Sequence, residues 1–372
     1  FWSGGLGDGK TRFVGSHTVE LTDGTRLQGR QIVIAAGSRA VLPPVPGIDS
    51  SKVYTNDNVM RMDELPARMV VIGGGVIAAE FSHVFSAFGT EVTQLNRSSR
   101  LLRNVDEEVV ARFEEAASKQ WNIVKDASLS EIRENADGSV TVVAKRTTEN
   151  GEELLEIPAD AVLVATGRRP NTDTLNAKNY FDVQDGGQLS VDKHQRVLYN
   201  GAPVPGVYAL GDVSSRYQLK HVANHEARVV QHNLSHPEDL RASDHRYVPA
   251  AVFSNPQIAV VGMTEEQARQ AAEREGFEIT VKAQNFGDTA YGWAMEDKIG
   301  LCKLIARKDN GVLLGAHLVG EESSVLIQPL LQAMSFGMDA RTLARGQYWI
   351  HPALTEIVEN ALLGLEFDEP AN

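Results

Sequence analysis

The sequence predicts an α/β fold for the first two thirds of the chain and an α+β domain for the last third. Three observations indicate this division. Apolar strands alternate with helices up to about residue 245, glycine turns follow several of these strands, and from about Val248 strands and helices continue without glycine-rich turns. Alternating strands and helices are typical of parallel sheets, so the first part is predicted to hold two Rossmann-like domains.

Composition narrows the classes of partner. The chain has 372 residues, 42% of them hydrophobic and 23% charged, with a formal net charge of −13. This length suits two or three domains, and the negative charge argues against nucleic acid and anionic membranes as partners. No apolar run is long enough to span a bilayer. A single cysteine, Cys302, excludes an internal disulfide and favours a cytoplasmic location.

The first fifty residues predict strands, a hairpin and a linker. Residues 12–35 alternate in polarity, with "RFVGSHTVEL" as one strand-like run. Asp23-Gly24 follows it, a pair typical of a hairpin turn. The proline-rich stretch 41–52 predicts a linker. Because the chain opens with Phe1 in "FWSGGLGDGK" rather than with Met, we expect that it lacks its natural N-terminus.

A glycine turn lies inside a predicted strand–helix–strand unit over 68–96. The stretch "VVIGGGVIAAE" places Gly73, Gly75 and Ala78 in G-x-G-x-x-A spacing, between an apolar strand and a helix. In this context the first glycine makes a tight turn, the second lets a pyrophosphate approach the backbone, and the small third residue lets helix and sheet pack closely. The unit therefore predicts a dinucleotide site; the alternative is a glycine turn in an ordinary parallel sheet.

The end of the second strand of this unit predicts which dinucleotide binds. A carboxylate there would bind the ribose 2′-hydroxyl of NAD. The chain has "QLNRSSRLLR" instead, with Asn96 at the strand end and Arg97, Arg100 and Arg103 after it. Arginines suit a 2′-phosphate, so we predict NADP(H). The alternative is a solvated basic loop. The next segment, 106–121, predicts an amphipathic helix.

A second set of turns predicts another nucleotide site. "IVIAAGSRAVLP" and "AVLVATGRRPNT" each place a small-small-Gly turn after an apolar strand, at Gly37 and Gly167. "GVYALGDV" places Asp212 directly after a strand. Polar residues at strand ends are where α/β folds bind ligands, and Asp212 could accept a hydrogen bond from a ribose or ribitol hydroxyl.

Four motifs in this order, "GGGVIAAE", "ATGRRPNT", "GVYALGDV" and "HPALTE", resemble the pyridine nucleotide–disulfide oxidoreductases. The resemblance covers essentially the whole chain. It implies an FAD domain interrupted by an NADP domain, then a dimerisation domain, with FAD and NADPH as cofactors and a homodimer as the working unit. The implied boundaries are 1–50 and 169–246 for the FAD domain, 51–168 for the NADP(H) domain, and 247–372 for the dimerisation domain.

The resemblance also implies roles for single residues. Arg97 and Arg103 match positions where NADPH-using members carry arginines, and Glu80 matches an acid that pairs with a lysine beside the flavin. Asp212 matches a ligand of the FAD ribitol. "QLKHVA", with Leu219 and His221, matches the segment at the flavin pyrimidine edge. The family's FAD fingerprint and redox Cys-x4-Cys pair do not occur in this sequence, so the chain as given is expected to be inactive.

His351 and Glu356 are the predicted acid–base pair. Residues five apart do not share a helix face, so the two can meet only if His351 precedes the helix. Pro352 supplies this, because it disfavours helix at residue 351 and is itself predicted as the first helical residue. An imidazole oriented by a carboxylate can exchange protons with thiols near neutral pH. The alternative is a histidine near a helix start with Glu356 on the solvated face.

The remaining candidates favour structural roles. Cys302 lies in an alternating apolar run and is predicted to be a buried small hydrophobe. His221 and His225 have the spacing of a metal pair, but no third ligand is evident, so no metal is predicted.

Within the family, the segments 94–109 and 346–367 resemble the mycothione reductases, which implies a small-molecule disulfide, mycothiol disulfide, as substrate. The alternatives are an enzyme like dihydrolipoyl dehydrogenase, glutathione reductase or mercuric reductase, or an inactive NADP-binding fragment.

Overall fold

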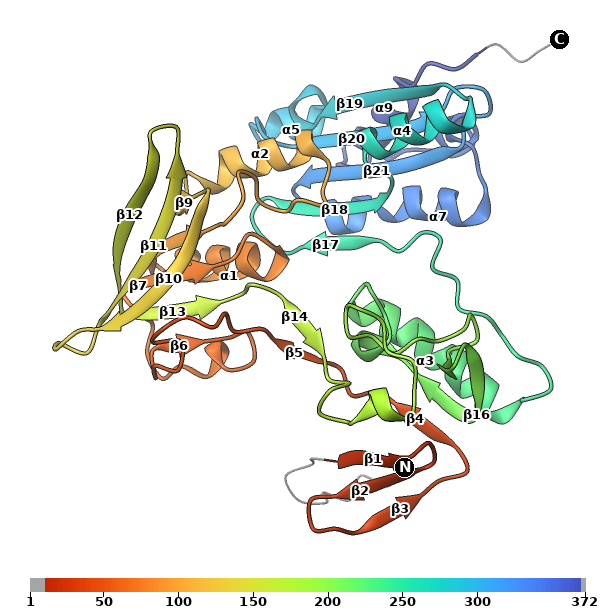
Figure 1. The fold of residues 1–372 in the computed structure, drawn as a ribbon. Helices are drawn as coiled ribbons and strands as arrows, with labels where there is room; N and C mark the ends of the chain where they lie inside the picture. The colour runs from red at the N-terminus through yellow and green to blue at the C-terminus, as the bar shows by residue number, and fades with distance from the viewer. Residues whose placement is uncertain (1–10, 369–372) are drawn as a thin grey trace. The chain divides into compact units, whose positions relative to one another are not determined.

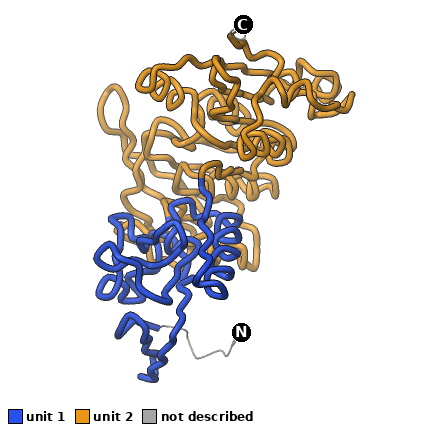
Figure 2. The backbone as a smooth tube through the Cα atoms, turned by 90° about the vertical axis from the view of Figure 1, so that its right-hand side faces the viewer, with its two compact units in different colours: residues 1–41, 168–245 blue, residues 42–167, 246–372 orange. Residues whose placement is uncertain are grey.

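The computed structural model describes residues 11–368, and internal contacts divide the chain into two compact units. One unit comprises residues up to 41 and 168–245, and the other comprises 42–167 and 246 onward (Figure 2). The finer assignment of FAD, NADP(H) and dimerisation domains stays a prediction. The stretch "FWSGGLGDGK", on which the expected N-terminal truncation depends, lies outside the described residues.

The described residues of the first unit, 11–41 and 168–245, form three small sheets and one long helix. Its strands form the sheets β1-β2-β3, β14-β5 and β15-β16-β4, with β4 parallel to β16 and α3 packed on β16. The elements are β1 (Thr11–Gly15), β2 (Thr18–Leu21), β3 (Arg26–Gln28), β4 (Ile32–Ile34), β5 (Ser38–Ala40), β14 (Arg168–Pro170), η2 (Ala177–Asn179), β15 (Arg196–Tyr199), β16 (Ala202–Ala209), η3 (Gly211–Val213) and α3 (Lys220–Ser235).

The predicted hairpin turn at Asp23-Gly24 is confirmed, because it joins the antiparallel strands β2 and β3. Gly24 has a φ of +83°, which glycine adopts without strain. The prediction of one strand over 12–21 is wrong. The chain turns at Ser16 and His17, so these residues form the β1–β2 hairpin, with a register shift at Gly15.

The first half of the second unit is built on a parallel sheet of order β6-β13-β7-β8-β9. An antiparallel sheet, β10-β11-β12, accompanies it (Figure 1). The elements are β6 (Val53–Tyr54), η1 (Val59–Arg61), β7 (Arg68–Ile72), α1 (Val76–Ala87), β8 (Glu91–Leu95), α2 (Glu107–Ala117), β9 (Asn122–Val124), β10 (Ala127–Glu134), β11 (Val140–Thr148), β12 (Gly151–Ala159) and β13 (Ala161–Val164). The strand–helix–strand unit and the helix expected within 106–121 are thereby confirmed.

Alternation along β7 and β13 explains why both faces of the parallel sheet are covered. Met69, Val71 and Leu163 belong to one apolar cluster with residues of α1 and α2. Val70 and Val162 belong to another cluster with residues of β10, β11 and β12. Successive side chains of a strand point to opposite faces, so these nearly all-apolar strands bury both. The carboxyl ends of β7 and β8 are left to carry the turns described below.

The second half of this unit is an antiparallel sheet of order β17-β18-β21-β20-β19. Helix α9 packs on β19 and β20, and α7 packs on β21. The elements are β17 (Ala250–Val252), β18 (Gln257–Gly262), α4 (Glu265–Glu275), β19 (Ile279–Asn285), η4 (Phe286–Asp288), α5 (Ala290–Ala294), β20 (Leu301–Arg307), β21 (Leu313–Gly320), α6 (Ser323–Leu326), α7 (Gln328–Phe336), α8 (Ala340–Arg345) and α9 (Glu356–Leu363). The predicted α+β character of the last third is confirmed. Within 11–368 no helix is both long and apolar enough to cross a membrane.

Candidate active site

The turn between β7 and α1 requires glycine at its first position. Gly73 has a φ of +141°, and a Cβ built there would lie 2.3 Å from the carbonyl oxygen of Ala165 on the neighbouring chain segment. Ala78 is fully buried one turn into α1, 3.5 Å from that same Cβ position. A larger residue at either place would separate the helix from the sheet.

The start of α1 presents free backbone donors. Gly75 is the N-cap residue, no side chain caps the helix, and a Cβ at Gly75 would meet no atom within 4 Å. The first N–H groups of a helix have no intrahelical acceptor and carry the positive end of the helix dipole. An uncapped helix start with open space before it fits the pyrophosphate of a dinucleotide.

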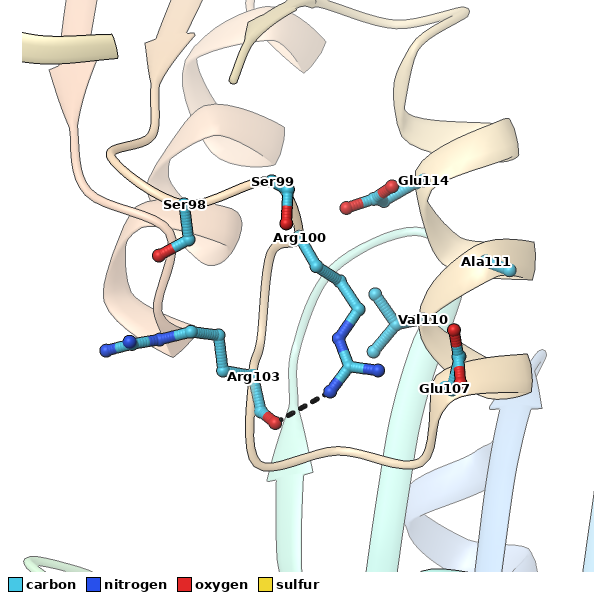
Figure 3. Close-up of a pocket in the computed structure, with 8 residues that line it drawn as sticks. All are labelled: Ser98, Ser99, Arg100, Arg103, Glu107, Val110, Ala111 and Glu114. Carbon is cyan, nitrogen blue, oxygen red and sulfur yellow. Dashed lines mark hydrogen bonds between the residues drawn. The ribbon is translucent and has the colours of Figure 1, made fainter. Parts of the chain in front are cut away.

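The arginine loop, residues 97–103, follows β8. Arg97 and Arg103 are exposed. Figure 3 shows that Arg103 extends toward the side of Ser98, whereas Arg100 turns toward α2 and donates a hydrogen bond to the carbonyl oxygen of Arg103 at 2.9 Å. An open hollow of about 650 Å³ lies between this loop and α2. Exposed guanidinium groups beside an uncapped helix start fit a phosphorylated ribose.

Asn96 shapes the arginine loop from inside. Its side chain is buried, and its Nδ2 donates to the carbonyl oxygens of Ser98 at 2.7 Å and Arg100 at 3.0 Å. The N–H of Leu102 donates to the carbonyl oxygen of Gly74 at 2.7 Å, which joins this loop to the glycine turn. Neither contact was predicted from the sequence, because an amide at a strand end does not reveal which way it turns.

Glu80, on the second turn of α1, is held by the residue that follows β17, the first strand of the antiparallel sheet. Its Oε1 accepts the N–H of Phe253 at 2.9 Å. Burial raises the pKa of Glu80, and the Phe253 N–H offsets only part of that effect. The pairing of Glu80 with a lysine concerns a residue outside this sequence and stays a prediction.

In the first unit the structure brings Gly37 and Asp212 to one place. Ser38, which follows Gly37, donates from its hydroxyl to Oδ2 of Asp212 at 2.6 Å. Arg168, which follows Gly167, donates to both the hydroxyl and the carbonyl oxygen of Ser38 at 2.8 Å. A Cβ at Gly37 or Gly167 would meet no atom within 4 Å, so both turns leave room for a ligand. Ser38 and Arg168 were not predicted, since neither residue type marks a site by itself.

Helix α3 begins beside the Asp212 turn. Leu219 is its N-cap and offers no side-chain hydrogen bond, and His221 is exposed on the first turn. One turn further, the buried carboxylate of Glu226 accepts the N–H of Gly211 at 2.7 Å and thereby fixes the turn that carries Asp212. These residues fit a flavin nucleotide. Asp212 can accept a hydrogen bond from a hydroxyl of the ligand, and the uncapped start of α3 can stabilise an electron-rich edge of the ring.

His351 and Glu356 meet as predicted. Nδ1 of His351 lies 2.7 Å from Oε1 of Glu356. The carboxylate holds Nδ1 as the protonated nitrogen, so Nε2 is the atom left for proton exchange. The imidazole is 70% exposed and the carboxylate 17% exposed, which leaves the ring accessible and its partner shielded.

The helix start differs from the prediction. Pro352 is not the first helical residue, since α9 begins at Glu356 with Thr355 as N-cap. The N–H of Glu356 donates to the carbonyl oxygen of Ala353, and this three-residue spacing makes a turn rather than α-helix over 353–356. The N–H of Ala353 reaches back to Glu356 Oε2 at 3.4 Å. The His351–Pro352 peptide bond is cis.

An open hollow of about 700 Å³ adjoins the pair. Its lining is His351, Pro352 and the η4–α5 segment, including Tyr291 and Trp293. A small molecule could therefore reach the imidazole from the side of α5.

Cys302 is confirmed as a buried residue of β20. Burial raises the pKa of its thiol, which removes it from thiolate chemistry. Across residues 11–368 no group of three or more His, Cys, Asp or Glu side chains is arranged to hold a metal ion.

Comparison with known proteins identifies the family. Residues 6–227 match the pyridine nucleotide-disulphide oxidoreductase family, and residues 248–362 match the dimerisation domain of pyridine nucleotide-disulphide oxidoreductases. The chain belongs to this family.

Individual relatives place this oxidoreductase more narrowly. It is 50% identical to mycothione reductase of Mycobacterium tuberculosis, over 94% of this chain and 74% of the relative. It is 32% identical to dihydrolipoyl dehydrogenase of Synechocystis, over 90% of this chain and 70% of the relative. Among solved structures it is similar to the flavoprotein disulfide reductase RclA of Escherichia coli, with a TM-score of 0.82, 28% identity, and coverage of 95% and 78% of the two chains.

These matches confirm the predicted fold class, the family and the disulfide oxidoreductase activity of the mycothione reductase type. Membership of the family implies FAD and a pyridine nucleotide, and the matched dimerisation domain supports a homodimer.

Proposed function

We propose that this oxidoreductase uses NADPH to reduce mycothiol disulfide, with His351 and Glu356 as its acid–base pair. The hydrogen bond of 2.7 Å between His351 Nδ1 and Glu356 Oε1 carries the proposal, because it leaves Nε2 of an exposed imidazole ready to exchange a proton. The substrate follows from the mycothione reductase relative at 50% identity.

His351 serves the thiol–disulfide exchange. A thiolate of the enzyme attacks one sulfur of the substrate disulfide, a mixed disulfide forms, and the other sulfur leaves as a thiolate. His351 Nε2 gives that thiolate its proton, and Glu356 stabilises the imidazolium before and the tautomer after the transfer. Cys302 cannot supply the attacking thiolate, because it is buried in β20. The attacking dithiol therefore comes from cysteines outside these 372 residues, and in a homodimer it belongs to the subunit facing this His–Glu pair.

The nucleotide-binding residues serve the reduction of the enzyme's own disulfide to that dithiol. FAD, when bound, passes electrons from the pyridine nucleotide to a disulfide. Gly75 and the uncapped start of α1 bind the dinucleotide pyrophosphate, and Arg97 and Arg103 bind a 2′-phosphate, which NADH lacks. The Arg103→Gln enzyme is expected to show about a tenfold higher KM for NADPH and an unchanged KM for NADH. Equal effects on both nucleotides would contradict the NADPH assignment.

The test of the acid–base pair is His351→Gln in the FAD-loaded enzyme. Turnover of mycothiol disulfide is expected to fall by about 10²- to 10⁴-fold, the usual contribution of a positioned proton donor. Reduction of the flavin by NADPH, followed by absorbance in a stopped-flow instrument, is expected to stay at the wild-type rate.

The matched control is His236→Gln, which removes another exposed histidine from the first unit. It is expected to leave both rates unchanged. If His351→Gln slowed both half-reactions to the same extent, or neither, His351 would not be the proton donor to the substrate.

A further inference from the structure

A buried lysine lies behind the arginine loop, and none of the steps above uses it. Lys303 is in β20, and its side chain is 6% exposed. Its Nζ lies 2.7 Å from Glu265 Oε2, 2.9 Å from Asp106 Oδ1 and 3.2 Å from Glu108 Oε2. An ammonium out of water is costly unless each of its protons has an acceptor, and these three carboxylates provide them.

The most buried of these carboxylates ends the segment that contains the arginine loop. Asp106 is 3% exposed and is the N-cap of α2, where its Oδ1 also accepts the N–H of Glu108 at 3.2 Å. Its Oδ2 accepts the N–H of Glu265, the first residue of α4, at 3.1 Å. Asp106 is therefore held on one side by Lys303 and on the other by a helix start of the antiparallel-sheet half.

The other end of the loop is held by hydrogen bonds to its backbone groups. Asn96 fixes two of its carbonyl groups, and Leu102 joins it to Gly74. Arg103 lies between the Leu102 contact and the Asp106 anchor. With both ends fixed, the backbone at Arg103 is held near Gly74, in the turn that precedes α1.

We infer that Lys303, acting through Asp106, is a positioning residue for the 2′-phosphate of NADPH. The ammonium itself does not touch the nucleotide; it fixes the carboxylate that fixes the loop. The inference rests on the proposed use of NADPH and explains how the antiparallel-sheet half takes part in nucleotide selection. Preorganised donors bind a phosphate more tightly, because the loop loses less freedom when the ligand arrives.

Two substitutions separate positioning from a general effect of charge. Lys303→Met removes a positive charge, and Asp106→Asn removes a negative one. If only the electrostatic potential mattered, the first would weaken binding of an anion and the second would strengthen it. If positioning matters, both weaken it. Asparagine is also a good N-cap residue, so Asp106→Asn keeps the cap of α2 while losing one of the two acceptor oxygens.

The experiment measures binding of 2′-phospho-ADP-ribose and ADP-ribose to the purified protein by titration calorimetry. These probes differ only in the 2′-phosphate. Both variants are expected to bind 2′-phospho-ADP-ribose about tenfold more weakly, because a displaced loop no longer holds Arg103 in place for its charge-assisted hydrogen bond to the 2′-phosphate. Both are expected to bind ADP-ribose as the wild type does. Lys308→Met is the matched control, since Lys308 is a more exposed lysine paired with Glu278 at 3.3 Å. It is expected to bind both probes normally.

Each outcome decides something. Opposite effects of the two substitutions, equal weakening of both probes, or no change would overturn the inference. If circular dichroism showed that Lys303→Met does not fold, Asp106→Asn alone would decide. Weaker binding of 2′-phospho-ADP-ribose by that variant would support positioning, and stronger binding would overturn it. If the wild type itself did not prefer 2′-phospho-ADP-ribose, the proposed use of NADPH would fail and this inference with it. If both variants kept the wild-type preference for 2′-phospho-ADP-ribose, the inference would fail and the proposed use of NADPH would stand.

Discussion

Replacing Lys303 with methionine is expected to lower the stability of the second unit far more than its size suggests. The substitution leaves Asp106, 3% exposed, without its cationic partner. Burial alone raises the pKa of Asp106, and the Glu265 N–H and Lys303 together lower it below its ordinary value. Removing one partner of a buried ion pair costs about 3–5 kcal/mol in the free energy of unfolding. In a folded unit of about 250 residues this corresponds to a fall in Tm of roughly 10 °C.

The assay is thermal unfolding followed by circular dichroism, with Lys308→Met beside it. That control breaks an ion pair whose lysine is 34% exposed and is expected to cost less than about 1 kcal/mol. The double variant Lys303→Met, Asp106→Asn is expected to recover part of the loss, because the buried negative charge is removed with its partner. If Lys303→Met melted with the control, or if the double variant were the sum of the single ones, the buried pair would not stabilise the unit as described.

Two further predictions concern the Gly73 turn and an ion pair of the first unit, in which the Arg39 guanidinium lies 2.6 Å from the Asp173 carboxylate. Gly73→Ala is expected to abolish dinucleotide binding and to lower the free energy of unfolding by about 2 kcal/mol or more, because its Cβ would lie 2.3 Å from the Ala165 carbonyl oxygen. The control Gly138→Ala, at a φ of +83° with open space around the Cβ, should lower it by only about 1 kcal/mol. Equal losses of stability in urea unfolding would contradict this prediction. Asp173→Asn tests pH dependence. The Arg39 guanidinium lowers the pKa of Asp173 from 3.8 to about 2, so its stabilisation is present above pH 3.8 and lost as the pH falls toward 2. Because the pair is over a third exposed, we expect a difference of about 1 kcal/mol at pH 7 that shrinks by pH 2, and a difference that grew on acidification would refute the assignment.

Local features were predictable from the sequence. The Gly73 turn, the Asp23-Gly24 hairpin and the proximity of His351 to Glu356 depend on residues a few positions apart, where backbone geometry leaves few choices. The prediction of Pro352 as the first residue of the last helix was wrong, because a three-residue turn and an α-helix start differ by a single hydrogen bond at Glu356.

Contacts between distant residues could not be predicted. Lys303 and Asp106 are 197 positions apart, and Ser38 and Asp212 are 174 apart. Alternation would place Lys303 on the face opposite the buried Cys302, and nothing in the local pattern shows that both faces of β20 are covered. From the sequence, Asn96 indicated only that the strand end lacks a carboxylate. Its buried amide in fact shapes the arginine loop.

The central claim is tested most directly by one steady-state comparison in the FAD-loaded, full-length enzyme. NADPH oxidation is measured with mycothiol disulfide and with oxidised glutathione as alternative substrates. The proposed function predicts rapid oxidation of NADPH with mycothiol disulfide and a far smaller kcat/KM with oxidised glutathione. Oxidation of NADPH no faster with mycothiol disulfide than with oxidised glutathione would contradict it.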